Sequence, residues 1–188
     1  MAIKKYSKVK FTLRKELIII LAAVALMIVA TVLLNLPNKQ ERFLKDWNAG
    51  GSSLGENLLY EEISFDELAD IIAEENNVYV LYATAADTTS VAVFDKVYSL
   101  ALNDYEVEKV YLIDSESLVG ADRETDTELD TELKGYETTF GFTLDETTDL
   151  FYFKDGKLVT EANRDKITDK GSDWTSEIIR IFNNSVEK

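Results

Sequence analysis

A polar tetrad follows the strand-like run YVLYATAA at 79–86 and precedes an apolar-periodic stretch that is typical of a helix. The tetrad consists of Asp87, Thr88, Thr89 and Ser90. A carboxylate or hydroxyl at a helix start accepts a backbone N–H and is favoured by the helix dipole, which is worth about 1 kcal/mol. We therefore predict that Asp87 or Thr88 caps a helix. The alternative for Asp87 is a carboxylate that contacts a ligand.

A second candidate site is the acidic segment RETDTELDTEL at 123–133, in which every second residue from 124 to 132 is acidic. A strand would align these carboxylates on one face, whereas a helix would scatter them. Aligned carboxylates suit Ca²⁺, which takes about six to eight oxygen ligands. An EF-hand loop is absent, so we favour a solvated acidic loop over a calcium site. The candidate ligands are Glu124, Asp126, Glu128 and Asp130.

The residue types that are missing exclude several kinds of chemistry. The chain contains neither cysteine nor histidine. Disulfides, thiol redox reactions, thiolate zinc sites and nucleophiles activated by histidine are therefore excluded. We predict no cofactor and no enzymatic activity, and chemistry based on carboxylates alone is the remaining enzymatic alternative.

The segment before residue 37 predicts a membrane anchor. Residues 17–34 read LIIILAAVALMIVATVLL, which carries no charge and is long enough to cross a bilayer as a helix. Six basic residues and one acid precede this run, so residues 1–16 are predicted to form a cytoplasmic tail. We expect a single transmembrane helix at 17–36. A cleavable signal peptide is the alternative, but no Ala-x-Ala-like site follows the apolar run.

Charge divides the chain in the same place. The residues after 36 carry 14 basic and 34 acidic side chains. So negative a surface repels nucleic acid phosphates, and we therefore expect no nucleic acid partner. It suits a cationic partner or metal ions, and solubility alone is the simpler explanation.

The remainder is predicted to form a linker and one extracytoplasmic domain. Residues 37–57 are interpreted as a juxtamembrane segment followed by the Gly/Ser-rich linker NAGGSSLGEN. Residues 58–188 have a common single-domain size. Ser64 and Glu67 form a capping-box pattern, and Asp155-Gly156 is a hairpin turn signal. The predicted strands cover 58–64, 78–83, 107–114, 150–153 and 157–160, with helices at 64–75, 89–103 and the C-terminus. Strands and helices in this order predict a small α/β sandwich.

The chain resembles the thioredoxin superfamily, especially its small membrane-tethered bacterial members. The resemblance lies in the order of elements and in two stretches of sequence, NVYVLYAT…SVAVFDKVYSLA and DLFYFKDGKLV. The resemblance covers roughly residues 58–188 and implies a thioredoxin-like sandwich. The Cys-x-x-Cys positions of that superfamily fall at Asp87 and Ser90. The place of its cis-proline falls near Thr148. The resemblance thus implies a redox-inactive scaffold with a trans, rearranged turn at Thr148.

These observations predict a membrane-tethered binding module or accessory subunit that docks on another envelope or membrane protein. The face around the tetrad, Thr148 and the segment KGYETTFGF is the predicted docking surface. Three aromatic residues of that segment are the partner-binding hypothesis: Tyr136, Phe140 and Phe142. An auxiliary subunit that recruits substrate for a cysteine-bearing partner in thiol–disulfide exchange is an alternative.

Overall fold

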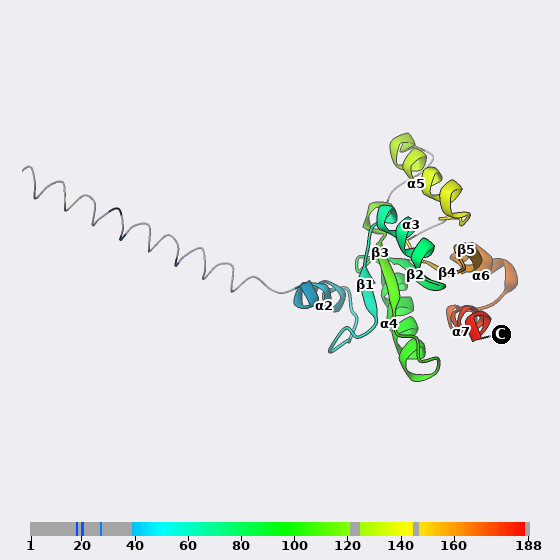
Figure 1. Cartoon of the computed structure of the whole chain (residues 1–188), viewed down its shortest axis with the longest axis horizontal. Coiled ribbons are helices and arrows are strands. Elements are labelled where there is room, and N and C mark those ends of the chain that lie inside the picture. The colour runs from blue at the N-terminus through cyan, green and yellow to red at the C-terminus, as the bar shows by residue number, and fades with distance from the viewer. Residues whose placement is uncertain are drawn as a thin grey trace, which may run out of the picture. The chain divides into compact units, whose positions relative to one another are not determined.

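The computed structural model describes residues 18, 20, 27, 39–120, 125–144 and 147–186. Its elements alternate between helix and strand along most of the chain (Figure 1). They are α2 (Lys39–Ala49), β1 (Tyr60–Glu62), α3 (Phe65–Glu74), β2 (Asn77–Ala83), α4 (Thr88–Asn103), β3 (Val110–Asp114), a 3₁₀ turn (Glu116–Leu118), α5 (Thr127–Phe140), β4 (Asp149–Lys154), β5 (Lys157–Ala162), α6 (Arg164–Lys170) and α7 (Trp174–Val186).

The five strands form one mixed sheet with the order β1-β3-β2-β4-β5. β1, β3 and β2 run parallel, whereas β4 is antiparallel to β2 and β5 is antiparallel to β4. β2 is buried from Val78 to Ala83, because it is the central strand and both faces of the sheet are covered. The α/β sandwich predicted from the sequence is confirmed.

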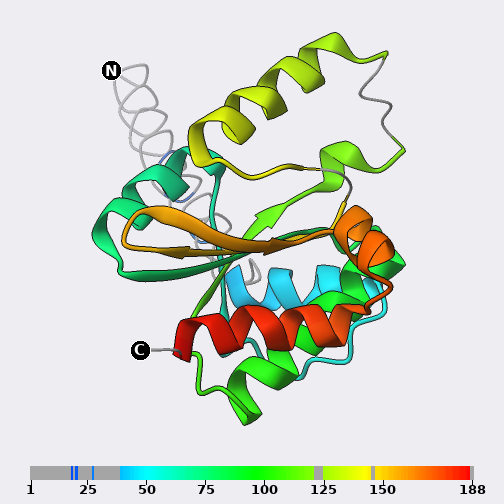
Figure 2. The same cartoon turned by 90° about the vertical axis from the view of Figure 1, so that its right-hand side faces the viewer.

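Helices cover both faces of the sheet (Figure 2). On one face, α4 and α7 pack with Phe43 and Trp47 of α2 in a core that includes Phe94 and Phe182. On the other face, α3 and α5 pack over a second core built around Tyr82 and a group of phenylalanines. The alternation of side chains along each strand supplies residues to both cores.

Local sequence signals account for the element ends that the sequence predicted. The Ser64 hydroxyl accepts the Glu67 N–H, and the Glu67 carboxylate accepts the Ser64 N–H at 2.7 Å, so the capping box is confirmed. At the β4–β5 turn, Asp155 and Gly156 have φ values of 51° and 77°. Two successive residues with positive φ are what a tight two-residue hairpin turn requires.

The segment predicted as a linker is part of the folded domain. Trp47 stacks on Phe94 with ring centroids 3.7 Å apart. Ser52 is buried, and its hydroxyl donates to Asp95 Oδ1 at 2.6 Å. A Cβ added to Gly50 would lie 2.2 Å from the Ala85 carbonyl oxygen, so this glycine permits a close approach of two backbones. The flexible linker expected at 48–57 is therefore wrong, and the fold begins at α2.

The predicted transmembrane helix at 17–36 lies outside the described residues, apart from Ile18, Ile20 and Met27, which are helical and exposed. In the part of the chain that the structure does describe, none of the helices combines the length and apolar character that a membrane span needs.

Two helices differ from the sequence-based expectation. α5 occupies much of the segment expected to be a solvated acidic loop, and α6 follows β5 directly. Leu129, Leu133, Tyr136 and Phe140 recur at helical spacing and face the second core, so packing against α3 and the sheet stabilises this polar helix.

Candidate functional site

The tetrad lies at the first turn of α4, immediately after the central strand. Asp87 is the N-cap, and its Oδ2 accepts the Ser90 N–H at 2.7 Å. The capping role predicted for Asp87 is thus confirmed. Thr88 and Thr89 are exposed, whereas Ser90 is completely buried. Only part of the tetrad therefore faces solvent.

Ser90 and Thr148 are brought together although 58 residues separate them in the sequence. Their hydroxyl oxygens lie 2.6 Å apart, and the Ser90 hydroxyl also donates to the Thr147 carbonyl at 2.9 Å. Since a serine hydroxyl carries one hydrogen, Thr148 is the donor in the hydroxyl pair. The residues that the resemblance places at a thiol position and near the proline are therefore joined by hydrogen bonds.

Ser115 completes this hydroxyl cluster from the end of β3. It is completely buried, and its hydroxyl donates to the same Thr147 carbonyl at 2.6 Å. Two donors thus satisfy the two lone pairs of one carbonyl oxygen. We call Ser90, Ser115, Thr147 and Thr148 the hydroxyl cluster. The described residues include no cis peptide bond, so the turn at Thr148 is trans as predicted.

Sequence reasoning missed one member of this cluster and one buried polar residue next to it in the sequence. Ser115 forms its bond with a residue 32 positions away, and no local pattern signals such a contact. Asp149 is completely buried at the first position of β4, opposite Tyr82 in the sheet register. The sequence does contain a signal for Asp149, because an acidic residue at the start of the apolar run DLFYF is unusual in a buried strand.

A pocket of about 540 Å³ adjoins the tetrad on the side of α2. Ala85 and Ala86 contribute to it from the loop before α4, and Trp47 contributes from α2. It is lined by four carboxylate residues, which are Asp46, Glu62, Asp114 and Glu116. Carboxylates and hydroxyls are thus the groups near the tetrad that could take part in chemistry.

The acidic segment does not form an aligned row of carboxylates. Asp126 is the N-cap of α5 and accepts the Leu129 N–H at 3.1 Å, while Asp130 pairs with Lys134 at 2.6 Å. Residues two apart on a helix point in nearly opposite directions, which scatters Asp126, Glu128 and Asp130. Glu124 lies outside the described residues. Within the described ranges, no group of three or more acidic side chains could hold a metal ion.

The three aromatic residues proposed as partner contacts differ in exposure. Phe140 and Phe142 are buried at 9 % and 3 % exposure, and Phe142 stacks on Phe151 with centroids 4.4 Å apart. The prediction that these two phenylalanines contact a partner directly is therefore wrong, because both pack in the core. Tyr136 is half-buried and stacks on Phe65 at 4.4 Å, so one of the three still reaches the surface.

Comparisons with known proteins find likeness in structure rather than in sequence. No family model matches the chain, and no curated protein matches it. A putative oxidoreductase with a thioredoxin fold is 19 % identical, with a TM-score of 0.41 over 58 % of this chain and 86 % of that one. A Plasmodium falciparum thioredoxin is 12 % identical, with a TM-score of 0.36 over 58 % of this chain and 93 % of that one. Mitochondrial thioredoxin 3 from Saccharomyces cerevisiae is 9 % identical, with a TM-score of 0.36 over 67 % and 95 %.

The chain has a thioredoxin-like fold. The fold is defined by a parallel β-α-β-α-β unit, then α5, an antiparallel hairpin and the two C-terminal helices. The tetrad opens the helix after the central strand, and Thr148 immediately precedes the hairpin, as the resemblance implied. Because no cysteine is present, this is a thioredoxin-like module without thiols.

Proposed function

We propose that the chain is a membrane-tethered, thiol-free thioredoxin-like binding module, an accessory subunit that docks on another envelope or membrane protein outside the cytoplasmic membrane. The observation that carries this proposal is the hydroxyl cluster. By the resemblance, Ser90 falls at the second Cys-x-x-Cys position and Thr148 near the place of the proline, and the two residues are buried and bonded to each other at 2.6 Å. A thioredoxin-like fold that lacks thiols can still present a surface for binding a partner.

The proposed anchor is the apolar run at 17–36, with the basic tail at 1–16 on the cytoplasmic side. Phe43 of α2 is the first residue buried in the domain core. Only Pro37 and Asn38 lie between the proposed anchor and α2, which begins at Lys39. We therefore propose that the partners of the domain are proteins in or near the membrane.

The acidic character of the domain supports docking on a cationic surface. The residues after 36 carry 34 acidic and 14 basic side chains. A surface of one sign accelerates association with a partner of opposite sign and disfavours association with anionic lipid headgroups. Binding is therefore expected to weaken as salt concentration rises.

The test is capture of partners by the full-length, tagged protein purified in a mild detergent, with identification by mass spectrometry. The control is an anchor-only chain that ends at Asn38, because Phe43 and Trp47 belong to the folded domain. A stoichiometric partner held only by the full-length chain is the expected result. A cysteine-bearing oxidoreductase among the captured proteins would indicate the auxiliary role in thiol–disulfide exchange. Capture of the same proteins by both chains, or of none, would contradict the docking function.

A further inference from the structure

A pocket of about 330 Å³ lies on the other face of the sheet, between the start of α3, the end of β3 and one side of α5. Its walls are largely apolar. Phe65 comes from α3, Tyr82 from β2 and Tyr136 from α5, with Ile63 and Leu129 beside them. Ring centroids lie 4.4 Å apart for Phe65 and Tyr136, and 5.5 Å apart for Phe65 and Tyr82. The size suits one large side chain of a partner.

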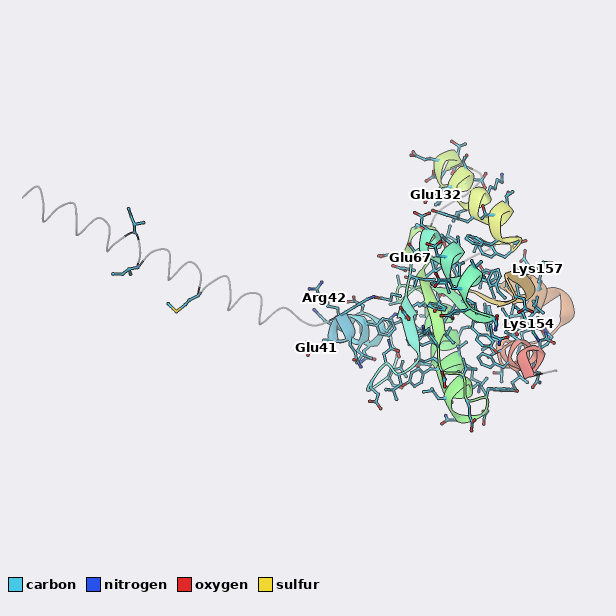
Figure 3. All side chains as sticks on the ribbon, in the orientation of Figure 1. Glu41, Arg42, Glu67, Glu132, Lys154 and Lys157 are labelled. Carbon is cyan, nitrogen blue, oxygen red and sulfur yellow. The ribbon has the colours of Figure 1, made fainter. Side chains whose placement is uncertain are left out.

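Carboxylates stand around this aromatic pocket. Asp114 and Glu132 contribute to its lining, and both residues are exposed. Figure 3 labels Glu132 on α5. Burial raises the pKa of the Tyr136 phenol, and the negative charges of Asp66 and Glu132 raise it further, so two carboxylates act on this tyrosine. Neither lysine nor arginine occurs among the described residues that line the pocket.

Aromatic walls combined with carboxylates match the chemistry of one kind of side chain. A guanidinium group stacks on aromatic rings, donates several hydrogen bonds to carboxylates and has an apolar stem that packs against aliphatic residues. An apolar side chain would leave Asp114 and Glu132 without a charge partner. An acidic side chain would be repelled by both.

We propose that this pocket, between α3 and α5, receives an arginine side chain from the protein on which the module docks. The guanidinium group lies against Tyr136 and pairs with Glu132 and Asp114. This inference rests on the proposed docking function and names the chemistry that recognises the partner. It places the contact on the α5 side of the sheet.

The test uses the full-length chain in neutral detergent with ¹³C-labelled tyrosine rings, observed by NMR. The probe is a blocked Gly-Arg-Gly tripeptide, and the control probe replaces arginine with citrulline, its neutral isostere. Tyr136→Phe identifies the Tyr136 resonance. The arginine tripeptide is expected to shift the Tyr136 resonance in a saturable way, and the citrulline tripeptide is expected to bind roughly threefold to tenfold more weakly.

Two matched variants on α5 sharpen this test. Glu132→Gln removes a carboxylate that lines the pocket, whereas Glu128→Gln removes an exposed carboxylate of the same helix that does not line it. Only Glu132→Gln is expected to weaken binding of the arginine tripeptide, by about threefold or more. Equal binding of the two tripeptides, equal effects of the two variants or an unmoved Tyr136 resonance would overturn the proposal.

Failure of this inference is distinguishable from failure of the docking function. If the full-length chain captures a partner while the tripeptide leaves Tyr136 unmoved, docking stands and the arginine pocket is wrong. If the tripeptide binds as expected and no partner is captured, the pocket stands and the docking function is wrong.

Discussion

The hydroxyl cluster and the α5 side of the sheet differ in how tightly they are held. Around the cluster, buried Ser90 and Ser115 both donate to the Thr147 carbonyl. Trp47 stacks on Phe94 of the same helix that Ser90 occupies. On the α5 side, Tyr136 is only half-buried and a pocket opens beside it. The difference shows that Ser90 and Thr148, which the resemblance places at a thiol position and near the proline, are buried in a packed region, whereas Tyr136 on the α5 side reaches the surface.

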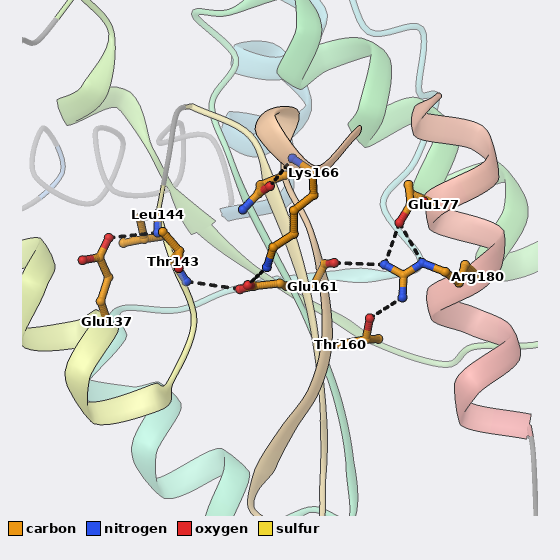
Figure 4. A network of polar contacts seen from close by, with 9 residues as sticks. Glu137, Thr143, Leu144, Thr160, Glu161, Lys166, Glu177 and Arg180 are labelled. Carbon is orange, nitrogen blue, oxygen red and sulfur yellow. Dashed lines mark hydrogen bonds and ion pairs between the residues drawn. The ribbon is translucent and has the colours of Figure 1, made fainter. Parts of the chain in front are cut away.

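The end of α5 is nevertheless anchored to the domain by a polar network (Figure 4). The Glu161 carboxylate on β5 accepts the Thr143 N–H at 3.1 Å and pairs with Lys166. Glu137 accepts the Leu144 N–H at 2.9 Å. These contacts fix the chain just after α5, while the exposed face and the first turns of the helix carry the acidic side chains. We therefore expect the first turn of α5 to open more readily than its C-terminal end, while buried Leu133 holds the middle of the helix in the core.

The largest expected effect comes from α2. Trp47→Ala removes a side chain that is 4 % exposed and stacked on Phe94, so it should lower the free energy of unfolding by about 3–5 kcal/mol. Tyr136→Ala, on the more open side, should cost less than half as much. Urea unfolding of the full-length chain in neutral detergent, followed by far-UV circular dichroism, measures both. Equal losses of unfolding free energy in the two variants would contradict the claim that the α2 region is packed more tightly than the α5 side.

A pair of glycines should respond with opposite signs. Gly50→Ala places a Cβ 2.2 Å from the Ala85 carbonyl oxygen, which should lower stability by about 1–3 kcal/mol. Gly135 lies within α5, and a Cβ there has no atom within 4 Å, so Gly135→Ala should raise stability by about 0.5–1 kcal/mol. The same unfolding measurement compares them. A stabilising Gly50→Ala would mean that the segment after α2 is loosely packed.

Ser90→Ala tests the hydroxyl cluster directly. The substitution removes a donor to the Thr147 carbonyl and the acceptor of the Thr148 hydroxyl, at a completely buried site. Stability should fall by about 1–2 kcal/mol. Thr89→Ala, at the exposed neighbouring position, is the matched control and should change stability by less than about 0.5 kcal/mol. If the two variants lose the same amount, the cluster contributes nothing beyond helix propensity.

A smaller loss of stability than in Trp47→Ala is expected when the N-cap of α4 is removed. Asp87→Ala removes the carboxylate that accepts the Ser90 N–H, which should cost about 1 kcal/mol. Asp87→Asn keeps an accepting oxygen at the cap, so it should recover most of that loss. Thermal unfolding of the three proteins distinguishes the outcomes. A full loss in Asp87→Asn would indicate that the charge, not the hydrogen bond, stabilises the helix start.

The sequence predicted the elements whose causes are local. The Ser64–Glu67 capping box, the Asp155-Gly156 turn and the apolar periodicity of α4 all depend on residues within a few positions of one another. Because these signals lie within each element, the α/β sandwich and the tetrad at a helix start followed from them.

The features that the sequence did not predict have long-range causes. Gly50 resembles a linker residue, yet it is required by the Ala85 carbonyl of a distant loop. No local pattern marks Ser90 or Ser115, because each hydroxyl donates to the Thr147 carbonyl, which is distant in the sequence. α5 does carry a local helix signal, because four apolar or aromatic residues recur at helical spacing: Leu129, Leu133, Tyr136 and Phe140. The alternating acidic residues of the same segment favoured a loop and outweighed this signal.

Hydrogen–deuterium exchange of the full-length chain tests most directly the claim that the region around the hydroxyl cluster is held more tightly than the first turns of α5. Amides of α4 from Ser90 onward and those of β4 should exchange only by global unfolding, whereas those in the first turns of α5 should exchange by local opening at lower free energy. Equal protection of the two regions, or faster exchange at α4 than at α5, would contradict this account.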